Sequence, residues 1–128
     1  MKGQRLYKIE KLCSETAIGA LFARGASASS TFSALAYPLR AVWRVNDKRT
    51  APCPQFLISV PKKKIRHAVD RVTLRRRIRE SYRLSRDLID RDKPVDIAFM
   101  YVADDLVPSS RILHSMHRIL RKIDESLQ

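Results

Sequence analysis

The spacing of apolar residues alternates between a helical and an extended period along this chain. Apolar residues recur every three or four positions over about 14–25, over about 65–90 and in the segment that begins at Ser109 or Ser110, which predicts three amphipathic helices. They alternate or form short runs over 31–37, 39–46, 55–61 and 95–102, which predicts four strands. The predicted order is therefore α-β-β-β-α-β-α.

This order favours the α+β class, with one sheet of about four strands and helices packed against it. At 128 residues the chain fits a single domain, residues 1–128, with residues 1–12 as a partly ordered N-terminal arm. We expect Pro38 to mark a bend between the first two strands, because proline cannot donate to a ladder. The second strand alternates as in a sheet with one buried face, with Leu39, Ala41, Trp43 and Val45 on one side and Arg40, Val42 and Arg44 on the other.

The helix predicted at about 65–90 has two different sides. One arc of about 100° on a helical wheel is mostly apolar and wide enough to lie on a core: Leu74, Ile78, Tyr82, Ser85, Leu88 and Ile89. A second arc, centred about 130° away, is basic: Arg75, Arg76, Arg79, Arg83 and Arg86. Arg71 lies at the border of the apolar arc, so we expect it to be partly buried and hydrogen-bonded, to Asp70 or to a strand end. One side of this helix is thus expected to pack on protein and the other to bind a polyanion.

The positive charge of the chain is concentrated in the same region. The 26 Lys and Arg against 13 Asp and Glu give a formal net charge of +13 and a pI near 10.5. Residues 62–83 contain ten basic and two acidic residues, which is +8 of that total. Such an excess favours partners that carry phosphate. The alternative is a solvated helix whose arginine stems cover the edge of the core.

Membrane and secretory proteins fit the sequence poorly. No run of about 18 apolar residues predicts a membrane span, and acidic residues before the apolar patch near residue 20 argue against a signal peptide. Cys13 and Cys53 form neither a CxxC pair nor a spaced metal set. We therefore expect free thiols, a cytoplasmic location and no contact with a membrane.

Catalytic motifs are also missing from the sequence. Three glycines cannot form a P-loop or a dinucleotide-binding fingerprint. His114 with His117, and Asp104 with Asp105, lack the further ligands that a metal site needs, and are more simply solvated side chains. We expect no catalytic residue and no metal site in the protein itself.

Residues 60–84 read VPKKKIRHAVDRVTLRRRIRESYRL. This segment resembles the signature of the protein subunit of bacterial ribonuclease P, which is approximately V-[SA]-K-K-x-x-x-x-A-x-x-R-N-R-x-K-R-x-x-R-E-x-[FY]-R, and it follows that signature without a gap. The likeness extends to Leu21 and Phe22 before Gly25, to an aromatic strand, and to Asp96 and Ile97 at the start of the strand after the long helix. It therefore covers most of the chain.

The resemblance implies a compact α-β sandwich of the ribosomal protein S5 domain 2-like type. In that fold the β-α-β crossover through the long helix is left-handed, against the usual rule. The resemblance also implies an accessory subunit of an endoribonuclease, which binds a catalytic RNA and the 5′ leader of precursor tRNA and assists removal of that leader. Mg²⁺ would be held mainly by the RNA subunit, and the protein alone would bind none.

The resemblance also implies two sets of binding residues. The RNA-binding positions of the basic segment are Lys62, Lys63, Lys64, Arg66, His67, Arg71, Arg75, Arg76, Arg79 and Arg83. The leader-binding cleft, between the sheet, the first helix and the long helix, would contain Ile18, Phe22, Phe32 and Tyr37, flanked by Lys62 and Lys63. Aromatic rings stack on unpaired bases of any sequence. Phe22 and Phe32 are equally consistent with core positions, and His67 with simple exposure to solvent.

The sequence departs from the signature at one place that matters, and it leaves two other functions open. Where the family has Arg-Asn-Arg, this chain has Arg71, Val72 and Thr73, so an amide and a guanidinium are lost from the basic face. A non-enzymatic RNA-binding module such as a ribosomal protein would share the basic helix and sheet. A DNA-binding protein with the long helix in a major groove is a third possibility, although no helix-turn-helix pair is evident.

Overall fold

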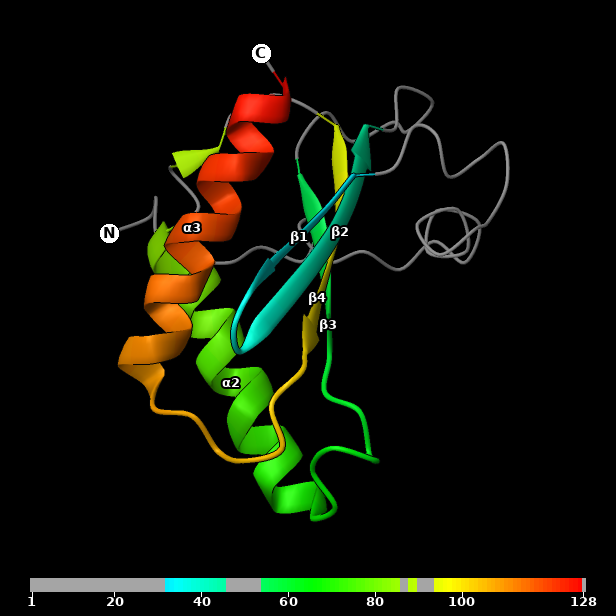
Figure 1. The fold of residues 1–128 in the computed structure, drawn as a ribbon, viewed down its shortest axis with the longest axis vertical. Coiled ribbons are helices and arrows are strands. Elements are labelled where there is room, and N and C mark those ends of the chain that lie inside the picture. The colour runs from blue at the N-terminus through cyan, green and yellow to red at the C-terminus, as the bar shows by residue number, and fades with distance from the viewer. Residues whose placement is uncertain (1–31, 46–53, 86–87, 90–93, 128) are drawn as a thin grey trace.

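The computed structural model describes residues 32–45, 54–85, 88–89 and 94–127. Within these residues, four strands form one sheet and two helices pack against it (Figure 1). The elements are β1 (Phe32–Ala36), β2 (Leu39–Val45), β3 (Gln55–Ser59), α2 (Ala68–Ser85), β4 (Val95–Tyr101) and α3 (Ser109–Leu127). The predicted strands are confirmed to within two residues at each end. The helix predicted at 14–25 and the arm at 1–12 lie outside the described residues.

The strand order in the sheet is β1-β2-β4-β3. β2 pairs antiparallel with β1 and with β4, whereas β3 pairs parallel with β4 and is joined to it through α2. Tyr37 and Pro38, linked by a cis peptide bond, form the turn between β1 and β2 and confirm the predicted bend at Pro38. Both helices lie on one side of the sheet, with α3 contacting β1 and β2 and α2 contacting β3 (Figure 1). The mixed α+β fold expected from the element order is therefore confirmed.

The buried side of α2 is the apolar arc that the sequence predicts. Leu74, Ile78 and Tyr82 are at most 1% exposed. The ring of Tyr82 lies 4.2 Å from that of Phe56 on β3 and 5.7 Å from that of Phe99 on β4, measured between centroids. This aromatic group joins α2 to the two parallel strands that it connects.

The α-helix is shorter than the predicted span of about 65–90. The backbone amides of Lys64 and Ile65 both donate to the carbonyl of Pro61, which makes a turn, and the first helical hydrogen bond runs from the amide of Arg71 to the carbonyl of His67. Ile65 is buried outside the helix, as is Ile89 beyond its C-terminal end. Periodicity shows which side chains reach the core, and a turn can place Ile65 there as well as a helix can.

The second strand differs from its predicted pattern at two valines. Leu39, Ala41 and Trp43 are buried as expected, but Val45 is 39% exposed at the strand's end. Val42 is buried with Ala98 in a second small cluster. Since successive residues of a strand point to opposite faces, Val42 lies on the face away from the main core. The prediction of one buried face is therefore wrong at β2, whose two faces both carry buried apolar residues.

The connection between β4 and α3 is held by Tyr101 and Arg77. The buried Tyr101 hydroxyl donates to the carbonyl of Asp105 and accepts from the amide of Val107 at 3.0 Å. Nη1 of Arg77 donates to the carbonyl of Val107 at 2.9 Å. Burial raises the pKa of the Tyr101 hydroxyl above its usual value. This loop is thus attached to both the sheet and α2.

Tyr101→Phe is expected to lower the free energy of unfolding by about 1–3 kcal/mol, because the Asp105 carbonyl and the Val107 amide lose their partner.

The raised pKa means that the folded state holds the Tyr101 proton more tightly than the unfolded chain does. That stabilisation is present below about pH 10 and is lost as the pH rises through the folded pKa. Urea unfolding across this pH range measures both effects.

The control is Tyr37→Phe, which removes a hydroxyl from a side chain that is 53% exposed. Equal losses of stability in the two variants would contradict the role of the Tyr101 hydroxyl.

Candidate nucleic-acid interface

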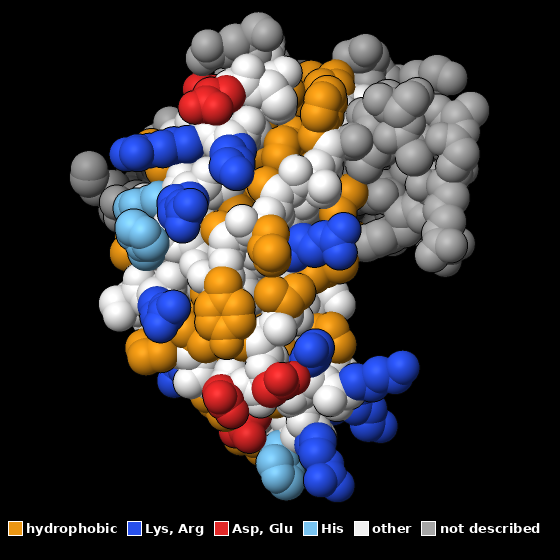
Figure 2. Space-filling view, viewed as in Figure 1, with side chains coloured by type: hydrophobic (Ala, Val, Ile, Leu, Met, Phe, Trp, Pro, Cys, Tyr) orange, Lys and Arg blue, Asp and Glu red, His pale blue; other side chains and the backbone are white. Residues whose placement is uncertain are grey.

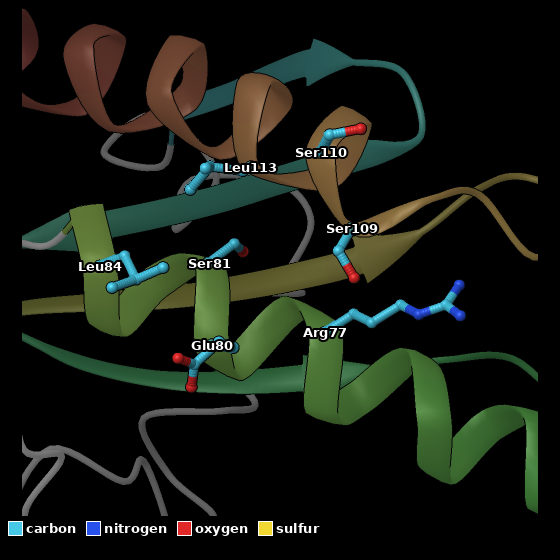
Figure 3. Close-up of a pocket in the computed structure, with 7 residues that line it drawn as sticks. All are labelled: Arg77, Glu80, Ser81, Leu84, Ser109, Ser110 and Leu113. Atoms are coloured by element: carbon cyan, nitrogen blue, oxygen red, sulfur yellow. The ribbon is translucent and has the colours of Figure 1, made fainter.

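The basic arc of α2 faces away from α3. At about 100° per residue, Arg75, Arg76, Arg79 and Arg83 fall within an arc of about 100°. Arg86, the fifth predicted member of this arc, lies outside the described residues. A different side of α2 faces α3 across a hollow of about 140 Å³ (Figure 3), lined by Arg77, Glu80, Ser81, Leu84, Ser109, Ser110 and Leu113. The basic arc is therefore turned away from both the core and the neighbouring helix.

Three guanidiniums of this arc are not engaged by any side chain that the structure describes. Arg76 and Arg79 are exposed and Arg75 is half-buried. None of the three has a hydrogen bond or an ion pair in the described part of the chain. Arg83 differs, because it pairs with Glu80 and its hydrogen bond lowers the pKa of the Glu80 carboxyl. The arginines most open to a phosphate are thus Arg75, Arg76 and Arg79.

Arg71 has a structural position at the start of α2. It is half-buried, and its Nη1 donates to the carbonyls of Ile65 at 3.0 Å and Arg66 at 2.9 Å. The predicted partial burial and hydrogen bonding are confirmed, but the predicted partners, Asp70 or a strand end, are wrong. The turn after β3 brings backbone carbonyls within reach of Arg71, and these carbonyls accept its protons. Arg71 therefore attaches the connection from β3 to the first turn of α2.

The connection held by Arg71 carries the other predicted basic residues. Its exposed members are Lys62, Lys63, Lys64, Arg66 and His67. Nζ of Lys64 lies 3.4 Å from a carboxylate oxygen of Asp104, in a pair that is open to solvent. Exposed pairs of this kind contribute little to stability and exchange readily with other anions. The structure thus extends the basic surface from α2 along the preceding connection.

The departure from Arg-Asn-Arg leaves an apolar spot inside this basic surface. Val69 is 76% exposed and Val72 is 50% exposed, and three positions apart on a helix they are neighbours. The hydroxyl of Thr73 donates to the carbonyl of Val69 at 3.1 Å, within the same helix. Neither Val72 nor Thr73 offers the amide or guanidinium of the signature, so charge here comes from the next turns of α2.

Of the four predicted cleft residues, the structure describes Phe32 and Tyr37, and these two do not lie beside the lysines. Ile18 and Phe22 lie outside the described residues. Phe32 belongs to β1 and Tyr37 follows it, at the sheet edge opposite to β3, whose end leads to Lys62 and Lys63. β2 and β4 thus separate Phe32 and Tyr37 from Lys62 and Lys63, and the prediction that these lysines flank a cleft that also contains Ile18 and Phe22 stays a prediction. Whether any of the four binds the leader stays a prediction.

Phe32 and Tyr37 instead lie beside α3. The ring of Phe32 is 47% exposed and stacks on Trp43 with centroids 6.1 Å apart, so Phe32 is not a fully buried core residue. Cζ of Arg111 lies 5.7 Å from the centroid of the Tyr37 ring. The Ser115 hydroxyl donates to the carbonyl of Tyr37 at 2.6 Å. Sequence reasoning missed this arrangement, because only the fold brings β1 to α3.

The described residues contain neither a candidate metal centre nor a membrane-spanning helix. No three His, Cys, Asp or Glu side chains among them lie close enough together to hold a metal ion. No helix in the same residues is long and apolar enough to cross a bilayer.

Comparison with known proteins gives consistent results. Residues 6–124 match the model of the family Ribonuclease P. A ribonuclease P protein component of Porphyromonas gingivalis, strain ATCC 33277, is 33% identical over 123 residues, which cover 92% of this chain and 85% of the relative. The corresponding protein of strain W83 is 32% identical with the same coverage.

Solved structures share the fold. The RNase P protein of Staphylococcus aureus superposes with a TM-score of 0.68 at 19% identity, covering 89% of this chain and 94% of the other. The RNase P protein from Thermotoga maritima gives the same TM-score and identity, covering 88% and 96%. With the family match over most of the sequence, these findings show that the chain belongs to the ribonuclease P protein component family.

Proposed function

We propose that the basic arc of α2 docks this chain onto the catalytic RNA subunit of ribonuclease P. The observation that carries the proposal is the state of Arg75, Arg76 and Arg79, which share one side of a helix and have no partner in the described part of the chain. Guanidiniums held on a rigid helix suit the phosphates of a folded RNA, because each can donate two parallel hydrogen bonds. Family membership supports an RNA partner and a place in tRNA 5′ processing.

In this proposal the protein supplies position and charge, and the RNA supplies the chemistry. A guanidinium stays protonated at all physiological pH values and has no acceptor atom. It can therefore neither take a proton from water nor attack phosphorus, but it can neutralise phosphates and hold two RNA segments in place. Mg²⁺ is expected mainly on the RNA subunit of the assembled endoribonuclease.

Precursor tRNA is the proposed substrate of that assembly, and the cytoplasm is its proposed location. The leader would contact the protein away from the α2 arc, which is already occupied by the RNA subunit. Residues in the segment before β1, including Ile18 and Phe22, remain the predicted contacts on the basis of resemblance.

Reconstitution tests the whole proposal: mixed with a bacterial ribonuclease P RNA at low magnesium, the protein should stimulate cleavage of a precursor tRNA. Cleavage by the protein alone would contradict it.

Binding to the RNA subunit should depend steeply on salt. If roughly six to eight phosphates on a partly single-stranded RNA are neutralised, a plot of log K against log salt should have a slope of about −4 to −6. Filter binding between about 50 and 400 mM salt, roughly an eightfold range, measures this slope. A slope near −1 would leave the basic arc without a role.

Arg76→Gln and Arg77→Gln remove the same charge from adjacent positions and should have different effects. Arg76→Gln is expected to weaken binding to the RNA subunit roughly two- to fivefold and to reduce the salt slope by about one. Its stability should be unchanged, because Arg76 is exposed and makes no hydrogen bond or ion pair with the described residues. Arg77→Gln is expected to lower the free energy of unfolding by about 1–2 kcal/mol, because the Val107 carbonyl loses a charged donor.

Thermal or urea unfolding of both variants provides the comparison, together with binding at fixed salt. If Arg77→Gln weakened RNA binding as much as Arg76→Gln without loss of stability, only net charge would matter and the α2 arc would have no special role.

A further inference from the structure

The apolar spot at the start of α2 is larger than its two valines. Ala68 is also exposed, and it precedes Val72 by four positions, so the two side chains are neighbours on the helix surface. Val69 is a neighbour of Val72 as well, three positions away. With exposed fractions of 76% for Val69 and 50% for Val72, the core buries little of this surface. Core packing therefore does not explain why the valines are there.

Val72 lies inside the basic arc of α2 and not beside it. At about 100° per residue, it falls within the angular range of the four described arginines of that arc. Arg75 and Arg76 follow Val72 by three and four positions and adjoin it on the helix surface. Arg66 and His67, which precede the apolar spot, are exposed. The spot consequently has basic side chains before and after it along the chain.

Figure 2 shows Lys and Arg side chains gathered at the lower end of the view, where Figure 1 places the start of α2 and the connection from β3. Within this region, the polar side chains of the first turn of α2 make bonds inside the protein. Arg71 donates to the carbonyls of Ile65 and Arg66, and the Thr73 hydroxyl donates to the carbonyl of Val69. On the side that carries the basic arc, the first turn thus presents methyl groups where the later turns present guanidiniums.

An apolar spot surrounded by cations fits only part of an RNA surface. Methyl groups pressed against a phosphate would remove its water without supplying a hydrogen bond, which is costly. Unpaired bases are usually bound by flat aromatic rings or guanidinium planes, whereas the methyl groups of valine form a rounded surface. The minor groove of an A-form helix is wide and shallow, and its riboses carry C–H groups between two rows of phosphates. Such a groove offers an apolar contact with phosphates on either side.

A second copy of this chain is a poorer occupant of the same spot. It would bring another net charge of +13, with its own basic arc, to a surface that is already basic. The surroundings of the spot instead complement a polyanion.

We propose that the apolar spot of Ala68, Val69 and Val72 contacts riboses in the shallow groove of a paired segment of the RNA subunit. Arg75 and Arg76 bind phosphates at the edge of the same groove. The inference rests on docking through α2, and it adds the kind of RNA surface that the first turn of α2 meets. Val72 is thereby a specificity-determining residue, because it makes an apolar contact where the family signature has an amide.

Val72→Ala tests the contact, and Val45→Ala on β2 is the matched control, because it makes the same change at another exposed valine. Filter binding to the ribonuclease P RNA of the same organism should weaken about three- to tenfold in Val72→Ala, which loses two methyl groups, and stay unchanged in Val45→Ala. The salt slope of Val72→Ala should equal that of the wild type, since no phosphate contact is lost. Thermal unfolding should show no loss of stability, because alanine favours a helix more than valine does.

Val72→Asn restores the amide of the signature at this position. Valine and asparagine have similar helix propensities, so the fold should be retained. Binding to the same RNA should weaken at least as much as in Val72→Ala, because the amide must lose water against an apolar surface. Tighter binding by Val72→Asn would overturn the proposal, since it would show a polar contact at this position.

Hydroxyl-radical footprinting identifies the RNA surface, because these radicals cleave at exposed riboses. The wild-type protein should protect riboses in a paired segment of the RNA subunit, and Val72→Ala should restore cleavage at those riboses. Changes confined to unpaired nucleotides would overturn the assignment to a groove.

Two further results separate this inference from the docking proposal. Unchanged binding in Val72→Ala, together with a steep salt slope, would overturn the ribose contact and leave docking through α2 standing. A salt slope near −1 for the wild type would contradict docking and the ribose contact together. Sedimentation of the free protein provides the last test: self-association that Val72→Ala abolishes would make the spot an interface between copies of this chain and overturn the proposal.

Discussion

The packing of Tyr82 against Phe56 and Phe99 is the constraint on which the rest of this structure depends. Parallel strands β3 and β4 need a long crossover, and α2 provides it. Burying each of Leu74, Ile78 and Tyr82 contributes about 1.5–3 kcal/mol, whereas repulsion between exposed like charges costs a few tenths. Core packing therefore decides the rotation of α2 about its axis. Once that rotation is set, Arg76 and Arg79 must point to solvent, so the exposed basic arc is a consequence of core packing.

The same packing limits how many basic residues can reach a partner. Arg71 donates to the carbonyls of Ile65 and Arg66, and Arg77 donates to that of Val107. A hydrogen bond from a charged donor contributes about 1.5–3 kcal/mol to folding stability, so these two guanidiniums stabilise the folded chain. Arg71 holds the connection that carries the lysines, and Arg77, with Tyr101, holds the loop before α3. Arg71 and Arg77 thus spend their hydrogen bonds on backbone carbonyls, and these bonds hold the segments that carry the remaining basic residues.

The exposed positive charge is divided between α2 and α3. The basic arc of α2 points away from α3, and α3 carries exposed cations of its own at Arg111, Arg118 and Lys122. The high net charge would oppose compaction if all cations gathered on one side. Distribution over separate faces reduces that repulsion.

Local patterns in the sequence determined the element order, the buried arc of α2 and the exposure of Arg76 and Arg79, because helical and extended periods depend on residues a few positions apart. The long basic signature indicated the family and, through resemblance, the fold type. Tertiary structure alone decided which distant residues meet. The strand order separates Phe32 and Tyr37 from Lys62 and Lys63, and β1 comes to lie against α3. These contacts join residues up to 83 positions apart, as between Trp43 and Ser126, and no local period encodes them.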